Sequence, residues 1–536
     1  MAPYQITFES LPDEIAHEIF INCLDALDGL EIEASEKIAK GSLLSKYPVV
    51  LTSICKYWTY LALTCPRLWA TIPVMIDHPS LPEYTPPLPV VEKWIERSSS
   101  LPLTFSIKQC GQGGDQYKGP YEPKPKRVLE MFIPHHLRWK RVFLFPGRSS
   151  TGLNLLKNSS SGLMAYPELR QIILRNKSWN YSEIEDDAAS LVHLLKHAPC
   201  LVSININLAS PSSRAMSSED FRRCYVDPIQ AAIPWDRLEE LLFPTETFTP
   251  LRVLEILRRG CAKLRSATFH LARGSNEEDE EDDDDDYPHN PYQFQQQHSR
   301  ARGPEYPLAY HDCLETLRLI PVLIDEPKII LKHATLPKLR DLTLYVPYEL
   351  HDNQEAWKEK GMVDEFKNFV RRSRCALEEL HYISISANSL YPPPFLECLS
   401  SVSTSLQVLS LQTYNADALM KVLTVRGQRP NDNKALCPNL HSIKLISWKY
   451  GGHGLLADMV ESRWNPSSEM RIAKLRSVNA GFTFNDFPFE DQFEPAPDPS
   501  LLTGDVQRLQ ALNRDGSGRK IGLTVYKNNI VTEYVK

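Results

Sequence analysis

The chain has 536 residues, of which 42% are hydrophobic and 24% charged, and its formal net charge at pH 7 is −7. This composition is typical of globular proteins, and the length predicts about three domains or one long repeat array. Ten acidic residues fill positions 277–286, so the rest of the chain carries a net charge of +3. That balance argues against binding to nucleic acid or to a membrane by bulk electrostatic attraction.

The sequence indicates an intracellular protein. No apolar run approaches the about 18 residues that a membrane-spanning helix needs. Residues 1–14 lack the basic start and the apolar core of a signal peptide, so we expect none. The eleven cysteines form no C-x-x-C pair, and their number is odd. We therefore expect reduced cysteines and a location in the cytoplasm or the nucleus.

The first predicted helix covers residues 12–27. Ser10 and Asp13 resemble a helix-capping pair, and Gly29 is expected to end the helix. The apolar residues of this helix cover more than the single stripe that a surface helix normally buries.

A second apolar segment spans residues 48–72. Leu51, Cys55 and Trp58 fall at helical spacing, and Pro66 is expected to stop the helix. Two short helices of this kind cannot bury all of their apolar surface against each other. Either the rest of the chain covers the remainder, or a partner protein binds an exposed helix face.

Four motifs in the first part of the chain carry a resemblance to a known family. They are LPDEI at residues 11–15, PRLW at residues 66–69, VVEKWIERSSSLPLTFSI at residues 90–107 and IPHHLRWKRVFL at residues 133–144. With these motifs, residues 8–145 resemble the F-box proteins of mushroom-forming fungi. In that family the third motif is a tryptophan-containing helix, a serine-rich stop and a strand.

The resemblance implies a docking module. An F-box binds a Skp-type adaptor, which links it to a cullin–RING ubiquitin ligase. Residues 29–47 make the loop between the helices longer than in a minimal F-box, and their polar composition indicates a surface insertion. By position in the motif, nine residues would contact the adaptor or form the F-box core beneath it: Leu11, Pro12, Ile15, Ile19, Phe20, Leu51, Cys55, Trp58 and Trp69.

The remainder of the chain contains a repeated pattern, L-x-x-L-x-L or a close variant, of which residues 139–144 form an atypical earlier copy. Apolar residues at the fourth and sixth positions predict a short strand with one buried face. Helical stretches are predicted between copies, at residues 184–198, 249–260, 363–374, 416–426 and 455–463. The ten copies begin at Leu169, Leu201, Leu238, Leu264, Leu314, Leu339, Leu377, Leu406, Leu440 and Leu475.

Strand–helix units of this length that pack side by side resemble leucine-rich repeats. The expected fold class is α+β overall: a small all-α F-box followed by an irregular α/β leucine-rich-repeat solenoid with parallel strands on its concave face. The expected division is an F-box at residues 8–75, a linker or N-terminal cap at 76–135, and the solenoid at 136–536, with a disordered acidic loop at 274–304 and a C-terminal cap at 501–536.

Motifs for catalysis were not found. The sequence contains neither a P-loop nor a nucleophile elbow. His193 and His197 stand four residues apart on a predicted helix, but Leu194 replaces the glutamate that a zinc protease needs. We therefore expect no catalytic residue, no cofactor and no metal. Aromatic residues are not grouped with basic ones, so we expect no nucleic-acid partner and no membrane partner.

A target-binding surface, if present, should lie on the strand positions that face away from the core. Those positions include Asn205, Arg318, Thr343 and Ser410. The residues predicted to bind a target are Arg175, His381 and Lys444 on strands, with Trp448 and Tyr450 just beyond one.

Together with the resemblance, the sequence predicts a non-catalytic, substrate-recognition subunit of an SCF-type cullin–RING ubiquitin ligase. The F-box would bind the Skp-type adaptor, and the repeats would bind an unidentified target protein. The alternative is a stand-alone repeat scaffold whose F-box-like helices only cap the solenoid. In that case residues 74–107 would cover both helices, and Pro12, Ile15 and Phe20 would not be exposed together.

Overall fold

The computed structural model describes residues 11–33, 47–76, 84–109, 124–147, 153–156, 164–176, 184–208, 222–271, 306–321, 325–346, 355–384, 392–412, 417–425, 435–448, 454–466, 471–483, 503–513, 520–527 and 530–535. The chain divides into two compact units, Met1–Thr245 and Glu246–Lys536. The predicted acidic loop at residues 274–304 lies outside the described residues. None of the helices in the described part of the chain has the length and apolar character needed to span a bilayer.

The first unit begins with four helical elements: α1 (Asp13–Glu33), α2 (Tyr47–Thr52), α3 (Lys56–Thr64) and the 3₁₀ helix η2 (Pro66–Trp69). The prediction that Gly29 ends the first helix is wrong. Glycine costs only about 1 kcal/mol inside a helix, and the next residues, Leu30 to Glu33, include strong helix formers. Of the predicted insertion at 29–47, residues 34–46 lie outside the described part of the chain.

The second apolar segment forms two helices instead of the single helix that was predicted. The chain turns at Ser53 and Ile54, and Cys55 then has the extended backbone of an N-cap residue, with φ −157° and ψ 169°. Its sulfur accepts a hydrogen bond from the backbone N–H of Trp58. Capping by a side chain satisfies an N–H group that has no partner within the helix.

The sheet of the first unit has the strand order β2-β1-β3-β4-β5-β6-β7. Every strand pair for which a register is recorded in this unit is parallel except β2 with β1. Its elements are β1 (Thr71–Ile76), β2 (Tyr84–Thr85), α4 (Leu88–Arg97), β3 (Leu103–Gln109), α5 (Lys124–Phe132), η3 (Ile133–Arg138), β4 (Trp139–Gly147), η4 (Leu153–Leu156), β5 (Gln171–Asn176), α6 (Ile184–Lys196), β6 (Ser203–Leu208), η6 (Arg222–Val226), α8 (Asp227–Ala232) and β7 (Glu240–Phe248).

Two expected domain boundaries fall inside regular structure. The all-α domain predicted at residues 8–75 ends within β1, because Ile72, Val74 and Ile76 bury their side chains in the sheet. Residues 76–135, expected as a linker or cap, contain α4, β3 and α5. The helix α4, the turn at residues 98–100 and the strand β3 match the order expected from the third motif.

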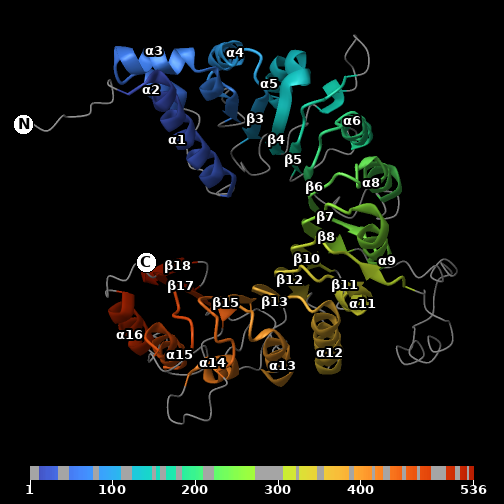
Figure 1. Cartoon of the computed structure of the whole chain (residues 1–536), viewed down its shortest axis with the longest axis vertical. Coiled ribbons are helices and arrows are strands. Elements are labelled where there is room, and N and C mark those ends of the chain that lie inside the picture. The colour runs from blue at the N-terminus through green and yellow to red at the C-terminus, as the bar shows by residue number, and fades with distance from the viewer. Residues whose placement is uncertain are drawn as a thin grey trace, which may run out of the picture. The chain divides into compact units, whose positions relative to one another are not determined.

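The second unit continues the alternation of strand and helix. Its main strand order is β8-β10-β12-β13-β14-β15-β16-β17-β18, parallel except for β18, and β9 pairs with β11 separately. In Figure 1 the helices of this unit line one side of its strands. Its elements are α9 (Pro250–Glu255), η7 (Ile256–Gly260), β8 (Ser266–Leu271), β9 (Ala309–Tyr310), β10 (Thr316–Ile320), α11 (Asp325–His333), β11 (Ala334–Thr335), β12 (Asp341–Val346), α12 (Glu355–Ser373), β13 (Glu379–Ser384), α13 (Pro392–Val402), β14 (Val408–Gln412), α14 (Asp417–Leu423), β15 (Ser442–Trp448), α15 (Leu455–Trp464), β16 (Ser477–Thr483), α16 (Thr503–Asn513), β17 (Lys520–Lys527) and β18 (Ile530–Val535).

The repeated pattern correctly predicts the strands. Each of the ten copies has its first leucine buried and begins two residues before a strand. The fourth and sixth residues of every copy are buried as well, because side chains alternate between the two faces of a strand. Among the predicted helices, the one at residues 249–260 begins as expected, with Thr249 accepting a hydrogen bond from the backbone N–H of Arg252.

Arginine side chains join neighbouring repeats in the second unit. Arg463 of α15 is fully buried and donates hydrogen bonds to the backbone carbonyls of Leu423 and Cys437. Burial lowers the pKa of this guanidinium to about 10. Arg372 of α12 donates in the same way to the carbonyl of Ala334.

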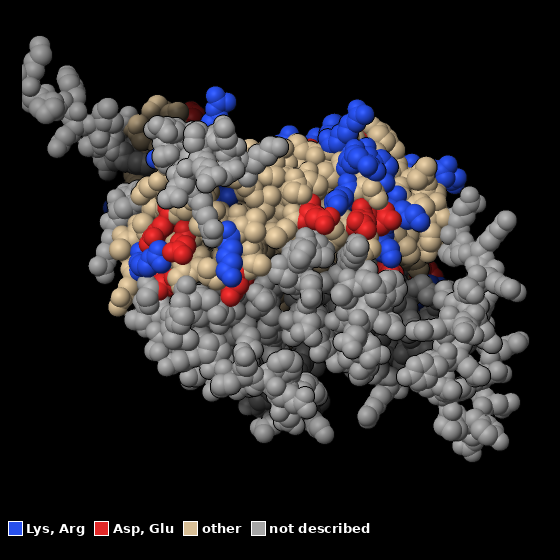
Figure 2. All heavy atoms as spheres, turned by 90° about the horizontal axis from the view of Figure 1, so that it is seen from below, with Lys and Arg blue, Asp and Glu red and all other residues tan. Residues whose placement is uncertain are grey.

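On the face shown in Figure 2, acidic and basic side chains are interspersed among other residues.

Candidate functional site

The N-terminal helices α1, α2 and α3 form a small core. Phe20 is only 2% exposed, and its ring packs 4.9 Å from that of Trp58. The Tyr47 hydroxyl on α2 donates a hydrogen bond to the carbonyl of Phe20. The Tyr57 hydroxyl on α3 donates to a carboxylate oxygen of Asp13 at 2.9 Å. These contacts connect the three helices.

Nine residues were predicted to contact the adaptor or to form the F-box core, and three of them are buried. They are Phe20, Leu51 and Trp69. The indole N–H of Trp69 donates a hydrogen bond to the carbonyl of Ala62, and its ring packs at 5.7 Å against that of Trp94. Leu11 and Trp58 are half-buried. These positions therefore have little or no side chain available to a partner.

The other four residues, Pro12, Ile15, Ile19 and Cys55, are exposed. The Ile15 side chain is 49% exposed and that of Ile19 is 39% exposed. Because they are four residues apart on α1, these two side chains lie on one stripe of the helix. We define the apolar helix surface as Ile15 and Ile19 with the exposed residues that α2 and its following turn add: Val49, Val50 and Ile54.

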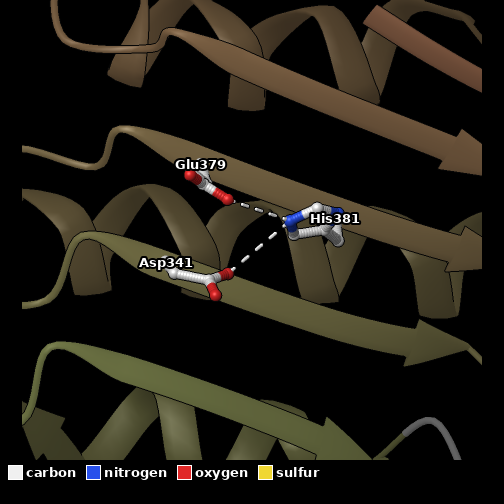
Figure 3. Close-up of side chains that lie close together, drawn as sticks. All are labelled: Asp341, Glu379 and His381. Carbon is white, nitrogen blue, oxygen red and sulfur yellow. Dashed lines mark ion pairs between the residues drawn. The ribbon is translucent and has the colours of Figure 1, made fainter. Parts of the chain in front are cut away.

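A second candidate lies on the strands of the second unit, on the face opposite the buried leucines. The register pairs Thr343 of β12 with His381 of β13, and Asp341 with Glu379. Nε2 of His381 lies 3.5 Å from Oε2 of Glu379 and 3.8 Å from Oδ1 of Asp341. Figure 3 shows the three side chains turned toward one another across the two strands. We call Asp341, Glu379 and His381 the carboxylate–histidine cluster.

Opposing effects act on the Asp341 carboxyl of this cluster. Burial raises the pKa of the Asp341 carboxyl, whereas the nearby charges of His381 and Arg318 lower it. Nη2 of Arg318 lies 3.7 Å from Oδ2 of Asp341. Oδ1 of Asp341 is buried and accepts no hydrogen bond from the described residues. The ligand atoms of the three residues lie within 4.8 Å of one another, so they could hold a metal ion.

The sequence predicted only one member of this cluster, His381. Asp341 and Glu379 were missed, although both occupy the third position of their repeat copies, LRDLTL and LEELHY. His381 occupies the fifth position of the second copy. Aligning the copies in parallel register would have placed these three residues on one face of adjacent strands.

The other predicted target-binding residues have different environments. Lys444 is exposed on β15. Arg175 of β5 is half-buried, with its guanidinium 5.9 Å from the ring centre of Phe145. Trp448 was expected just beyond its strand, but it is the last residue of β15, because pairing with Phe482 extends the strand. The Trp448 side chain and all of Tyr450 lie outside the described part of the structure.

Two other positions expected to face outward are buried. Thr343 is 5% exposed and Ser410 is 3% exposed. By register, Thr343 lies between Arg318 and His381, and Ser410 lies between His381 and Lys444. Longer side chains on both sides shield these short ones from solvent, which a single-strand pattern does not reveal. The outward positions Asn205 and Arg318 are half-buried and exposed, respectively.

His193 and His197 pack with their ring centres 4.2 Å apart on α6. Nδ1 of His197 lies 2.8 Å from the carbonyl oxygen of His193, so this nitrogen is occupied by the helix backbone. Burial and the neighbouring His197 lower the pKa of His193.

In the first unit, the equivalent third positions form a hydrogen-bonded ladder. Nε of Arg141 donates to Oε1 of Gln171 at 2.8 Å, and Nε2 of Gln171 donates to Oγ of Ser203 at 3.2 Å. Oγ of Ser203 donates in turn to Oε2 of Glu240 at 2.8 Å. We call these four residues the polar ladder. It spans β4 to β7, in register.

Comparison with protein-family models found no match, and comparison with curated proteins found none either. Functional inference therefore depends on the residues and on the geometry described above.

Proposed function

We propose that this chain is the non-catalytic, substrate-recognition subunit of an SCF-type cullin–RING ubiquitin ligase. The apolar helix surface would bind a Skp-type adaptor, and the outward strand face of the second unit would bind the target protein. The chain would contribute proximity, by raising the effective concentration of the target near the transferred ubiquitin.

The observation that carries this proposal is the exposure of the apolar helix surface. Five branched aliphatic side chains are between 39% and 52% exposed on α1, α2 and the turn after α2. Single exposed aliphatic residues are normal, but a group of them on neighbouring short helices indicates a protein-binding surface. Covering the exposed part of each side chain contributes about 1 kcal/mol to binding.

The division of roles within the motif also supports the proposal. Phe20, Leu51 and Trp69 hold the helices together, which leaves Ile15 and Ile19 available on the outside. A docking module needs both properties, because a partner binds tightly only to a surface that is already ordered.

Two observations favour the second candidate, a scaffold in which the helices cap the repeats. The Trp69 ring packs against Trp94, and the guanidinium of Arg97 lies 4.6 Å from the centre of the same ring. Residues within 74–107 therefore cover part of η2, whereas the scaffold hypothesis requires them to cover both predicted helices. Phe20 is buried, so Pro12, Ile15 and Phe20 are not exposed together, which the scaffold hypothesis also expects. Pro12 and Ile15 themselves are exposed.

Co-purification with a fungal Skp-type adaptor tests the proposal. The informative variant is Ile15→Ser with Ile19→Ser, and the matched control is Val422→Ser, which changes an equally exposed aliphatic residue on α14. We expect the double variant to lose about 2 kcal/mol of binding, a weakening of about 30-fold, while the control binds like the unmodified chain. If the unmodified chain does not bind the adaptor, the scaffold is the better description.

A further inference from the structure

The carboxylate–histidine cluster has the composition of a metal site. An imidazole nitrogen and carboxylate oxygens are ligands that Zn²⁺ accepts, whereas Mg²⁺ and Ca²⁺ prefer oxygen ligands alone. The three atoms concerned are Nε2 of His381, Oδ1 of Asp341 and Oε2 of Glu379. All three lie within 4.8 Å of one another.

One of the observed separations matches that of a tetrahedral ion, and a second exceeds it slightly. Zinc lies about 2.0–2.2 Å from nitrogen and oxygen ligands, which places neighbouring ligand atoms about 3.3–3.6 Å apart. The observed separations are 3.5 Å from His381 to Glu379 and 3.8 Å from His381 to Asp341. Both exceed the usual length of a charge-assisted hydrogen bond, so a small side-chain movement would admit an ion between these groups.

The available atom of Asp341 provides a second, independent observation. Arg318 lies near Oδ2, at 3.7 Å, and the other oxygen, Oδ1, faces His381. Oδ1 is buried and accepts no hydrogen bond from any described residue. A buried carboxylate oxygen that accepts no hydrogen bond costs about 1–3 kcal/mol, and a bound cation would offset that cost.

The sheet holds the ligands in place. Asp341 and Glu379 are register partners on β12 and β13, and His381 is two residues beyond Glu379 on the same face. A site on paired strands is more precisely positioned than a site on loops. We infer that Asp341, Glu379 and His381 bind one Zn²⁺ ion on the outward face of the second unit.

Three protein ligands leave a fourth tetrahedral position open. Glu379 is half-exposed and His381 is 26% exposed, so this position is accessible from solvent. It would be occupied by water or by a donor atom of a molecule bound to the strand face. The inference concerns only the ion and does not rest on the proposed function. Adaptor binding and zinc binding can therefore fail separately.

Isothermal titration of the full-length chain with zinc chloride, after dialysis against EDTA, tests the site. We expect one ion per chain that is lost in Asp341→Asn and in His381→Gln. Removing a ligand should weaken binding by more than the about 10–100-fold that a change in the outer shell causes. The matched control is Glu378→Gln, which changes the adjacent carboxylate, paired with Arg340 at 3.5 Å instead of with His381.

Cobalt substitution gives a second readout that does not depend on stoichiometry. Co²⁺ in a tetrahedral site should give visible absorption bands in the unmodified chain and in Glu378→Gln, but not in His381→Gln. The thermal transition of each variant without metal verifies that it is folded, and Glu379→Gln provides a further ligand variant. Zinc binding that survives in all three ligand variants would overturn the inference, because the ion would then belong to cysteines or to His193 and His197. Absence of binding would overturn it too, leaving only an ion pair.

Discussion

The polar ladder of the first unit and the carboxylate–histidine cluster of the second occupy comparable positions in the repeats. In the ladder, each donor meets an acceptor: Gln171 accepts from Arg141, and Ser203 donates to Glu240. In the cluster, the carboxylates of Asp341 and Glu379 both lie near the imidazole of His381, and only Asp341 also lies near a guanidinium, that of Arg318. A hydrogen-bond network in which every donor has an acceptor stabilises the sheet. A group with more acceptors than donors can instead bind a cation or a further hydrogen-bond donor.

The comparison shows how a repeat array can separate stability from function. The residues of the polar ladder form hydrogen bonds with one another across three pairs of neighbouring strands. They therefore have hydrogen-bond partners within the sheet itself. The cluster uses two third positions and one fifth position, and its carboxylate oxygens outnumber the nearby donor groups. Substitutions that break the hydrogen bonds of the polar ladder should therefore destabilise the protein. Substitutions that neutralise a carboxylate of the cluster should not.

The largest effect is expected from Ser203→Val. This change removes the hydroxyl that accepts from Gln171 and donates to Glu240, and puts a larger apolar side chain in its place. We expect a loss of about 1–2 kcal/mol in the local free energy of opening. Hydrogen exchange of peptides from β5, β6 and β7 measures this local free energy of opening. Peptides from β13 to β15 provide the internal control. Unchanged protection in β6 would mean that the ladder contributes no stability.

A smaller effect, of opposite sign, is expected from Asp341→Asn without metal. Burial raises the folded-state pKa of Asp341 above its ordinary value of 3.8. The stability contributed by the protonated carboxyl is therefore present below pH 3.8 and lost as the pH rises through the folded-state pKa. At neutral pH the variant should be more stable, by less than about 1 kcal/mol because the site is partly exposed.

Urea unfolding of metal-free protein, at neutral pH and at pH values near 4, measures this difference. The gain of the variant should shrink as the pH falls. A variant that is less stable than the unmodified chain at neutral pH would show that the ion pairs of Asp341 outweigh its burial.

The smallest effect is expected from Glu378→Gln. Its partner Arg340 is well exposed and lies at 3.5 Å, and such surface pairs contribute between about 0 and 1 kcal/mol. Raising the salt concentration should remove whatever difference the urea midpoint shows. A loss as large as that of Ser203→Val would mean that exposed pairs matter as much as the ladder.

The strands and their buried faces could be predicted from the sequence because both depend on local periodicity. A leucine followed by apolar residues at the fourth and sixth positions is sufficient to place Ile204 and Ile206, or Leu409 and Leu411, in the core. The candidate sites were predicted less completely. Exposure of Ile15 and burial of Phe20 depend on which side of α1 packs against Trp58, and no local pattern encodes that choice.

The sequence by itself therefore determined the ten repeat strands, several of the helices and the strand residues that point inward, since alternation within a strand is a property of the backbone. Tertiary structure decided the rest. Packing covered Trp69 with Trp94 and buried Thr343 between longer neighbours. It also brought Asp341 to His381, which are 40 positions apart in the chain, because parallel register joins residues that no short stretch of sequence contains.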